Sequence, residues 1–123
     1  MRERFSCGGL SSAPPRAGFE IEAWLVDADY RPAPVNQRFL ETFNNPLATP
    51  ELATFNIELN NTPRVLRDRV FEPFFLEMQQ LLEDASKVAS RLDARLLLTG
   101  ILPTAEPEDF NLENMSDMNR YRV

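Results

Sequence analysis

The chain of 123 residues contains no histidine and a single cysteine, Cys7. Without histidine, catalysis by Ser-His or Cys-His pairs, histidine-ligated zinc and the usual proton carrier at neutral pH are all excluded. A lone cysteine forms no intramolecular disulfide, and no metal or redox spacing surrounds it, so we expect a reducing, cytoplasmic setting. Any chemistry must therefore depend on carboxylates, arginines, amides or a hard metal ion.

Long apolar runs and basic clusters are also missing. No segment approaches the roughly 20 apolar residues that span a bilayer, and the N-terminal segment lacks the apolar core of a secretory signal. The net charge is -6, from 19 acidic and 13 basic residues, and the nearest thing to a basic cluster is Arg64, Arg67 and Arg69. We therefore expect no binding to membranes or nucleic acid.

The N-terminal segment, residues 1–17, is rich in Arg, Ser and Gly. Its arginines and serines are weakly typical of a transit peptide, but Glu3 and the short length favour a flexible arm. The remainder, residues 18–123, is expected to be one domain, because its apolar content suffices for a core without disulfides.

The stretch "AGFEIEAWLVD", Ala17 to Asp27, alternates between apolar and other residues as a half-buried strand does. Because strand side chains point to alternate faces, Glu20 and Glu22 share the face opposite Phe19 and Ile21. The apolar face predicts contact with a core. The other face carries paired negative charge, which belongs either to solvent or to a site.

A second alternating stretch, "ELATFNIELNN", covers residues 51–61. Phe55, Ile57 and Leu59 are predicted on its apolar face and Glu58 on its polar face. Glu51 and Glu58 are seven residues apart, so they reach one site only if Glu51 precedes the strand or a bulge intervenes.

Two helices and a third strand complete the predicted elements. Asn36 is expected to cap a short helix over residues 37–43, and a long helix is expected to begin close to Pro73. The apolar run over residues 94–103 predicts a third strand, more buried than the others, and Ser116 with Asp117 predicts a helix cap near the chain end. The long helix has an apolar stripe that we assign to core packing: Phe71, Phe74, Phe75, Met78, Leu81, Leu82, Ala85, Val88, Ala89 and Leu92.

These patterns predict an α+β fold, in which an antiparallel sheet packs on helices. If the two alternating strands pair, Glu20, Glu22 and Glu58 lie within several ångströms of one another, and a hard divalent ion such as Mg²⁺ or Mn²⁺ would offset their repulsion. Two other interpretations remain open: a solvated sheet face, and a glycosidase-type carboxylate pair, which requires opposed environments across a cleft.

The order of the segments resembles that of a known family. The chain contains in turn "GFEIEAWLVD", "ELATFNIELNNTPR", a long amphipathic helix, "LLLTGILPT" and "NMSDMNRYR". In this order they resemble the N-terminal part of the glutamate-cysteine ligase type 2 family, whose members are ATP-dependent carboxylate-amine ligases. The resemblance covers roughly Gly18 to Val123, and it implies a fold similar to that of glutamine synthetase, with a sheet curved around the active site.

The resemblance also implies roles for single residues. Glu20 and Glu22 match acids that bind the Mg²⁺ ions bridging the ATP phosphates. Glu58 matches the acid of the second strand and Glu51 the acid that opens that segment, so the resemblance implies four metal-binding glutamates. Arg64 and Arg120 match candidates for binding an acidic substrate or phosphate. The implied reaction, a step of glutathione biosynthesis, converts a glutamate side-chain carboxylate into an acyl phosphate, which an amine such as cysteine then captures.

The chain departs from the family in two respects. Where many members have Gly-Thr-His-Pro, this chain has Gly100-Ile-Leu-Pro103, so the acceptor amine is not identified by its residues. Family members are also several times longer, with further ATP-binding elements beyond the position of Val123. We therefore expect the isolated chain to be inactive and to self-associate, and we keep as an alternative a non-catalytic ligand-binding or partner-binding domain.

Overall fold

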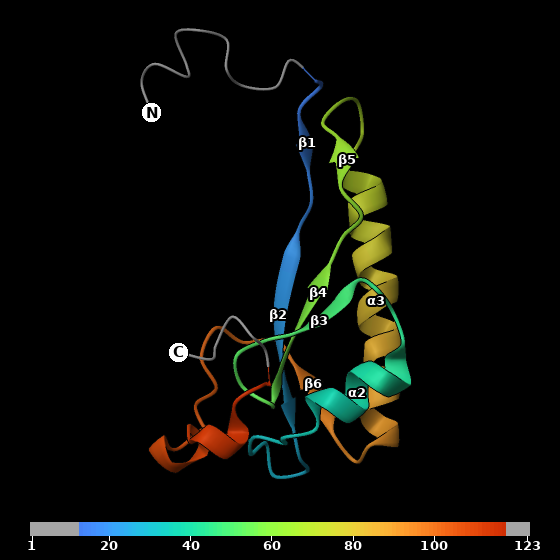
Figure 1. Cartoon of the computed structure of the whole chain (residues 1–123). Coiled ribbons are helices and arrows are strands. Elements are labelled where there is room, and N and C mark those ends of the chain that lie inside the picture. The colour runs from blue at the N-terminus through green and yellow to red at the C-terminus, as the bar shows by residue number, and fades with distance from the viewer. Residues whose placement is uncertain (1–12, 118–123) are drawn as a thin grey trace, which may run out of the picture.

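The structure, a computed structural model, describes residues 13–117 and shows an α+β fold with antiparallel sheets (Figure 1). In chain order the elements are β1 (Arg16–Ala17), β2 (Glu20–Val26), α2 (Asn36–Phe43), β3 (Ala48–Pro50), β4 (Asn56–Asn60), β5 (Arg64–Val65), α3 (Phe71–Arg91), β6 (Arg95–Leu97) and the 3-10 turns η1 (Pro107–Asp109) and η2 (Leu112–Asn114). Within residues 13–117, no helix is long and apolar enough to cross a membrane.

Four antiparallel strands form the main sheet in the order β3-β4-β2-β6. Beyond one end of β2 and β4, β1 pairs with β5, so that two long segments of chain run side by side (Figure 1). Strand pairing therefore begins at Arg16, two residues before the domain boundary expected at Gly18. The predicted pairing of the two alternating strands is confirmed.

The pairing changes register between the two sheets. Ala17 lies opposite Arg64 and Glu20 lies opposite Asn60, so three residue steps on one strand face four on the other. One extra residue is thus accommodated within Asn61–Pro63, as in a β-bulge. Because side chains alternate with a period of two, one extra residue moves those beyond it to the opposite face.

The core lies between the sheet and the two helices, with α3 running along the sheet (Figure 1). Its strand residues follow the predicted alternation: Ala23, Leu25, Ile57 and Leu59 are fully buried. Phe39 of α2 is also fully buried, and its truncation to alanine should cost about 3–5 kcal/mol. From α3 the buried residues are Phe74, Met78, Leu81, Ala85, Val88 and Ala89.

The long helix begins where its sequence predicts but buries less of its first turns. Pro73 lies in the first turn of α3, where its missing N–H has no helical partner to lose. Phe71 and Phe75, which we expected in the core, are 66% and 67% exposed. Only Phe74 of this end packs inward, edge to face on Phe19 with ring centroids 5.0 Å apart, because α3 here faces the narrow β1–β5 ribbon rather than the four-stranded sheet.

Two further sequence expectations are wrong. The third strand, β6, is not the most buried one: it lies at the edge of the sheet and pairs only with β2, so Arg95 and Leu98 are exposed. Asn36 does not cap α2 from outside. It is the first residue of the helix, Val35 is the N-cap without a side-chain hydrogen bond, and the Asn36 side chain is buried instead. The helix expected after Asp117 falls on residues 118–123, outside the described residues.

Candidate functional site

The predicted acids meet on the face of the sheet opposite the core. In the β2–β4 ladder, Glu22 lies directly opposite Glu58, and Glu20 lies opposite Asn60. On the other side of β4, Thr49 of β3 is the partner of Glu58. We call the surface formed by these five residues the acid face; its side chains alternate with the buried ones, so the pleat of the strands holds them together.

Hydrogen bonds fix one carboxylate of the acid face. Glu58 Oε1 accepts a hydrogen bond from the Thr49 hydroxyl at 3.0 Å and another from the Asn60 amide at 2.8 Å. Glu58 is half-buried, whereas Glu20 and Glu22 are exposed. The second oxygen of Glu58 makes no hydrogen bond within residues 13–117, so it is the oxygen that a ligand would meet.

Like charges directly opposite each other on paired strands are destabilising, and the attraction of both carboxylates to a cation between Glu22 and Glu58 would outweigh their repulsion. Mg²⁺ commonly takes one or two protein carboxylates and completes its octahedron with water and substrate phosphates. The Glu22–Glu58 pair fits that requirement. Within the described ranges, no three acidic or cysteine side chains gather into a complete protein cage, so a bound ion would need ligands from a substrate or water.

Glu51 lies outside the strand ladder that contains this pair. It follows β3 in the connection to β4, so the first of the two alternatives left open by the sequence is correct: Glu51 precedes the strand. Its carboxylate accepts a hydrogen bond from the backbone N–H of Leu52 at 3.3 Å. Glu51 therefore has no position in the ladder that brings Glu22 and Glu58 together.

Arg64 lies on the helix side of the ribbon rather than on the acid face. Its Nη2 is 3.6 Å from the Oε2 atom of Glu77 on α3, and its Nε is buried without a hydrogen-bond partner among the described residues. The register change before β5 explains this placement, because it moves Arg64 to the face that α3 covers. Arg120, the other predicted arginine, lies outside the described residues.

Glu77 joins α3 to the bulged segment. Its carboxylate accepts hydrogen bonds from the backbone N–H and hydroxyl of Thr62, at 3.0 and 2.8 Å, and from the Asn61 amide at 3.1 Å. Burial raises the pKa of the Glu77 carboxyl, but these hydrogen bonds and the charge of Arg64 outweigh it, so that the pKa lies below its ordinary value. The Arg64–Glu77 pair therefore stabilises the contact between α3 and the bulged segment.

Protein-family models, curated proteins and solved structures show no match to this chain.

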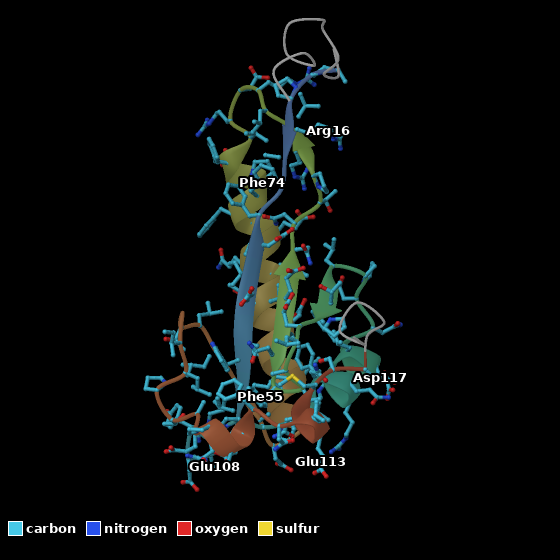
Figure 2. All side chains as sticks on the ribbon, turned by 60° about the vertical axis from the view of Figure 1, so that its left-hand side comes forward. Arg16, Phe55, Phe74, Glu108, Glu113 and Asp117 are labelled. Atoms are coloured by element: carbon cyan, nitrogen blue, oxygen red, sulfur yellow. The ribbon has the colours of Figure 1, made fainter. Side chains whose placement is uncertain are left out.

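Aromatic side chains cover one end of the acid face. Trp24 shares a face with Glu20 and Glu22, stacks on Phe55 at 5.9 Å between ring centroids, and donates a hydrogen bond from Nε1 to the Thr99 carbonyl at 2.9 Å. Phe55 also meets Phe110 edge to face (Figure 2 shows its position). Phe55 was expected beside Ile57 and Leu59; it is fully buried as they are, but it packs on Trp24 and Phe110 rather than in the core cluster that contains Ile57 and Leu59.

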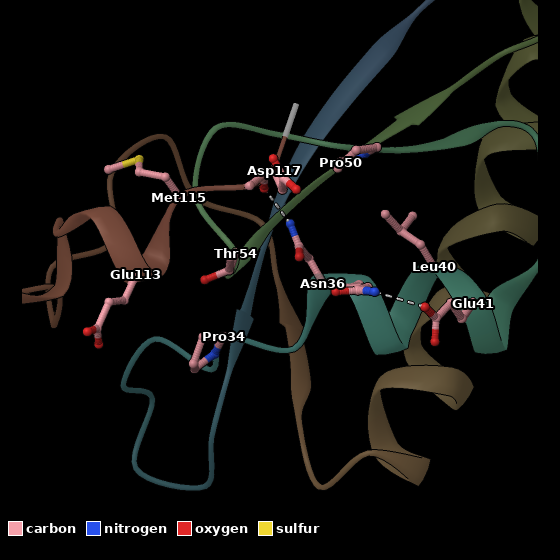
Figure 3. A pocket seen from close by; sticks show the side chains of 11 residues that line it. Pro34, Asn36, Leu40, Glu41, Pro50, Thr54, Glu113, Met115 and Asp117 are labelled. Atoms are coloured by element: carbon pink, nitrogen blue, oxygen red, sulfur yellow. Dashed lines mark hydrogen bonds between the residues drawn. The ribbon is translucent and has the colours of Figure 1, made fainter. Parts of the chain in front are cut away.

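A cleft of about 540 Å³ lies between α2, the β3–β4 connection and residues 113–117 (Figure 3). Asn36, 4% exposed, forms part of its wall and donates hydrogen bonds to the carbonyls of Ala53 and Asn56 and to the Ser116 hydroxyl. This cleft was not predicted from the sequence, because Asn36 and Ser116 both have the residue type of a helix cap. Its lining consists of Pro34, Asn36, Gln37, Leu40, Glu41, Pro50, Thr54, Glu113, Met115, Ser116 and Asp117.

Proposed function

We propose that this chain is the N-terminal part of an ATP- and Mg²⁺-dependent carboxylate-amine ligase similar to the glutamate-cysteine ligase type 2 family, with a glutamine synthetase-like sheet. The observation that carries the proposal is the register of β2 and β4, which sets Glu22 opposite Glu58 on the face of the sheet away from α2 and α3. The motif order from Gly18 onward supports the same family. The setting we propose is the cytoplasm.

The acids of the chain would hold the metal through Glu22 and Glu58, with Glu20 two residues along the same face. Mg²⁺, or Mn²⁺, supplies neutralisation of charge on the transferring phosphoryl group of ATP. In the reaction, the substrate's side-chain carboxylate would attack the γ-phosphorus of ATP and release ADP, and an amine such as that of cysteine would then attack the acyl phosphate and displace phosphate to form the amide. Such transfer needs positioning and electrostatics rather than a histidine base, which suits a chain without histidine.

Electron paramagnetic resonance of Mn²⁺ in the presence of ATP tests the proposal. We expect the chain to bind Mn²⁺–ATP, and Glu58→Gln to lose that binding, whereas Glu83→Gln on the exposed side of α3 retains it. In a full-length protein carrying this chain, Glu20→Gln or Glu58→Gln should abolish amine-dependent release of ADP. Near-normal turnover in both variants would contradict the proposal.

A second candidate is a ligand-binding domain without catalysis. The observation that favours it is the cleft of about 540 Å³, whose wall is fixed by the buried Asn36 side chain. The two candidates differ in where and what they bind. Titration with Mg²⁺–ATP separates them, because the absence of binding at millimolar nucleotide would favour the second candidate.

A further inference from the structure

We propose that Thr49 and Asn60 are positioning residues that hold Glu58 in the orientation in which it binds the divalent ion. This inference rests on the proposed function. It assigns a role to two residues that lie on different strands and whose spacing in the sequence does not indicate that they act together. Thr49 is the ladder partner of Glu58 on β3, and Asn60 lies two residues beyond Glu58 on the same face of β4.

The three side chains form a closed set of hydrogen bonds. The Thr49 hydroxyl donates to Glu58 Oε1 at 3.0 Å, and the Asn60 amide donates to the same oxygen at 2.8 Å. The Asn60 amide also lies 3.4 Å from the Thr49 hydroxyl, so the hydroxyl accepts from Asn60 while it donates to Glu58. All three residues are half-buried, which protects these hydrogen bonds from competition with water.

Thr49 and Asn60 both donate a hydrogen bond to Oε1 of Glu58, and neither donates to its second carboxylate oxygen. Because β3 and β2 flank β4 on opposite sides, the oxygen held by Thr49 is tied toward β3. The second oxygen of Glu58 is then left for an ion shared with Glu22, its ladder partner on β2. A glutamate without these donors would have to lose its side-chain freedom when the ion binds, and affinity would fall accordingly.

The expected loss of metal affinity can be taken from other proteins in which a residue that hydrogen-bonds to a metal ligand was removed. Removing such a partner weakens metal affinity about 10- to 100-fold. A purely structural role predicts a different outcome, namely a lower stability of the fold without a change in affinity of the folded protein. Measuring affinity and stability on the same variants therefore separates the two roles.

The experiment measures the Mn²⁺ dissociation constant of the whole chain by electron paramagnetic resonance, with ATP present, and the urea midpoint with a chelator. Thr49→Val removes the hydroxyl while keeping the shape, and Thr49→Ser restores it. We expect Thr49→Val and Asn60→Ala each to weaken Mn²⁺ binding about 10- to 100-fold, while Thr49→Ser stays within about threefold of the parent chain. The binding assay contains no urea, and the parent chain and all variants should be folded in it.

The outcomes distinguish this inference from the function on which it rests. If Thr49→Val binds Mn²⁺ as tightly as the parent chain while Glu58→Gln does not bind, the cation site stands and the positioning role is overturned. If Thr49→Ser is as weak as Thr49→Val, the hydroxyl is not the cause and the inference is also overturned. If Glu58→Gln binds like the parent chain, the cation site itself is refuted.

Discussion

Replacing Glu22 with glutamine removes one of two carboxylates that face each other across β2 and β4. Two unit charges about 6 Å apart interact by about 0.7 kcal/mol in water and by about 3 kcal/mol at an effective dielectric constant of 20. Glu22 is exposed and Glu58 is half-buried, so the lower figure applies. We therefore expect Glu22→Gln to raise the free energy of unfolding by about 0.5–1 kcal/mol when no divalent cation is present.

Addition of Mg²⁺–ATP should make the parent chain more stable than Glu22→Gln, the reverse of the order expected without a divalent cation. A ligand at 100 times its dissociation constant stabilises the native state by about 2.7 kcal/mol. The parent chain should gain that stability, and Glu22→Gln should gain much less because one of two protein ligands is gone. Urea unfolding followed by circular dichroism, once with a chelator and once with Mg²⁺–ATP, measures both differences.

Glu83→Gln is the matched control, because it removes the same charge from an exposed position of α3. We expect it to change stability by less than about 0.5 kcal/mol in either solution. Two results would refute the reasoning. A loss of stability for Glu22→Gln in the chelator would mean that no repulsion exists between the two acids, and an equal gain from Mg²⁺–ATP in both chains would mean that the pair does not bind the ion.

Three further predictions concern the fold. Glu77→Gln should cost about 1–3 kcal/mol at neutral pH. Because the pKa of Glu77 is lowered on folding from its ordinary value of 4.5, the difference in urea stability should shrink below that pH and vanish only as the pH falls through the lower pKa of the folded state; a pH-independent difference would contradict this. Asn36→Leu should cost about 1–3 kcal/mol in the same assay by leaving buried acceptors unpaired, whereas a change below about 0.5 kcal/mol would count against the network. The chain should self-associate through exposed Phe71 and Phe75, so the double change to serine should lower the mass seen by light scattering; a monomeric parent chain would exclude this.

Local patterns were sufficient to predict the pairing of the acids. The period of two in β2 and β4 determines which side chains share a face, and the apolar residues on one face fix the register against a core. The result is visible in the pairing of Glu22 with Glu58. The apolar stripe of α3 predicts a core helix for the same reason, since Met78 and Ala85 lie on one side of it.

Features that depend on tertiary position were not predictable. The extra residue within Asn61–Pro63 has no signature in a strand that alternates regularly before it, yet it decides the face of Arg64. The exposure of Leu98 depends on β6 lying at an edge, which its apolar sequence does not reveal. Asn36 carries the residue type of a helix cap, and only the proximity of Ser116 makes it a buried donor.

The placement of Arg64 changes how a phosphate would have to be held. A triphosphate near Glu22 and Glu58 brings negative charge to a surface that is already negative, so direct binding is unfavourable without a cation. Arg64 cannot supply that cation from its observed position, because it lies across the sheet and is paired with Glu77. Among residues 13–117, a divalent ion on the acid face is therefore the group that would join the nucleotide to the protein, and the two hydrogen bonds that orient Glu58 would act on that contact.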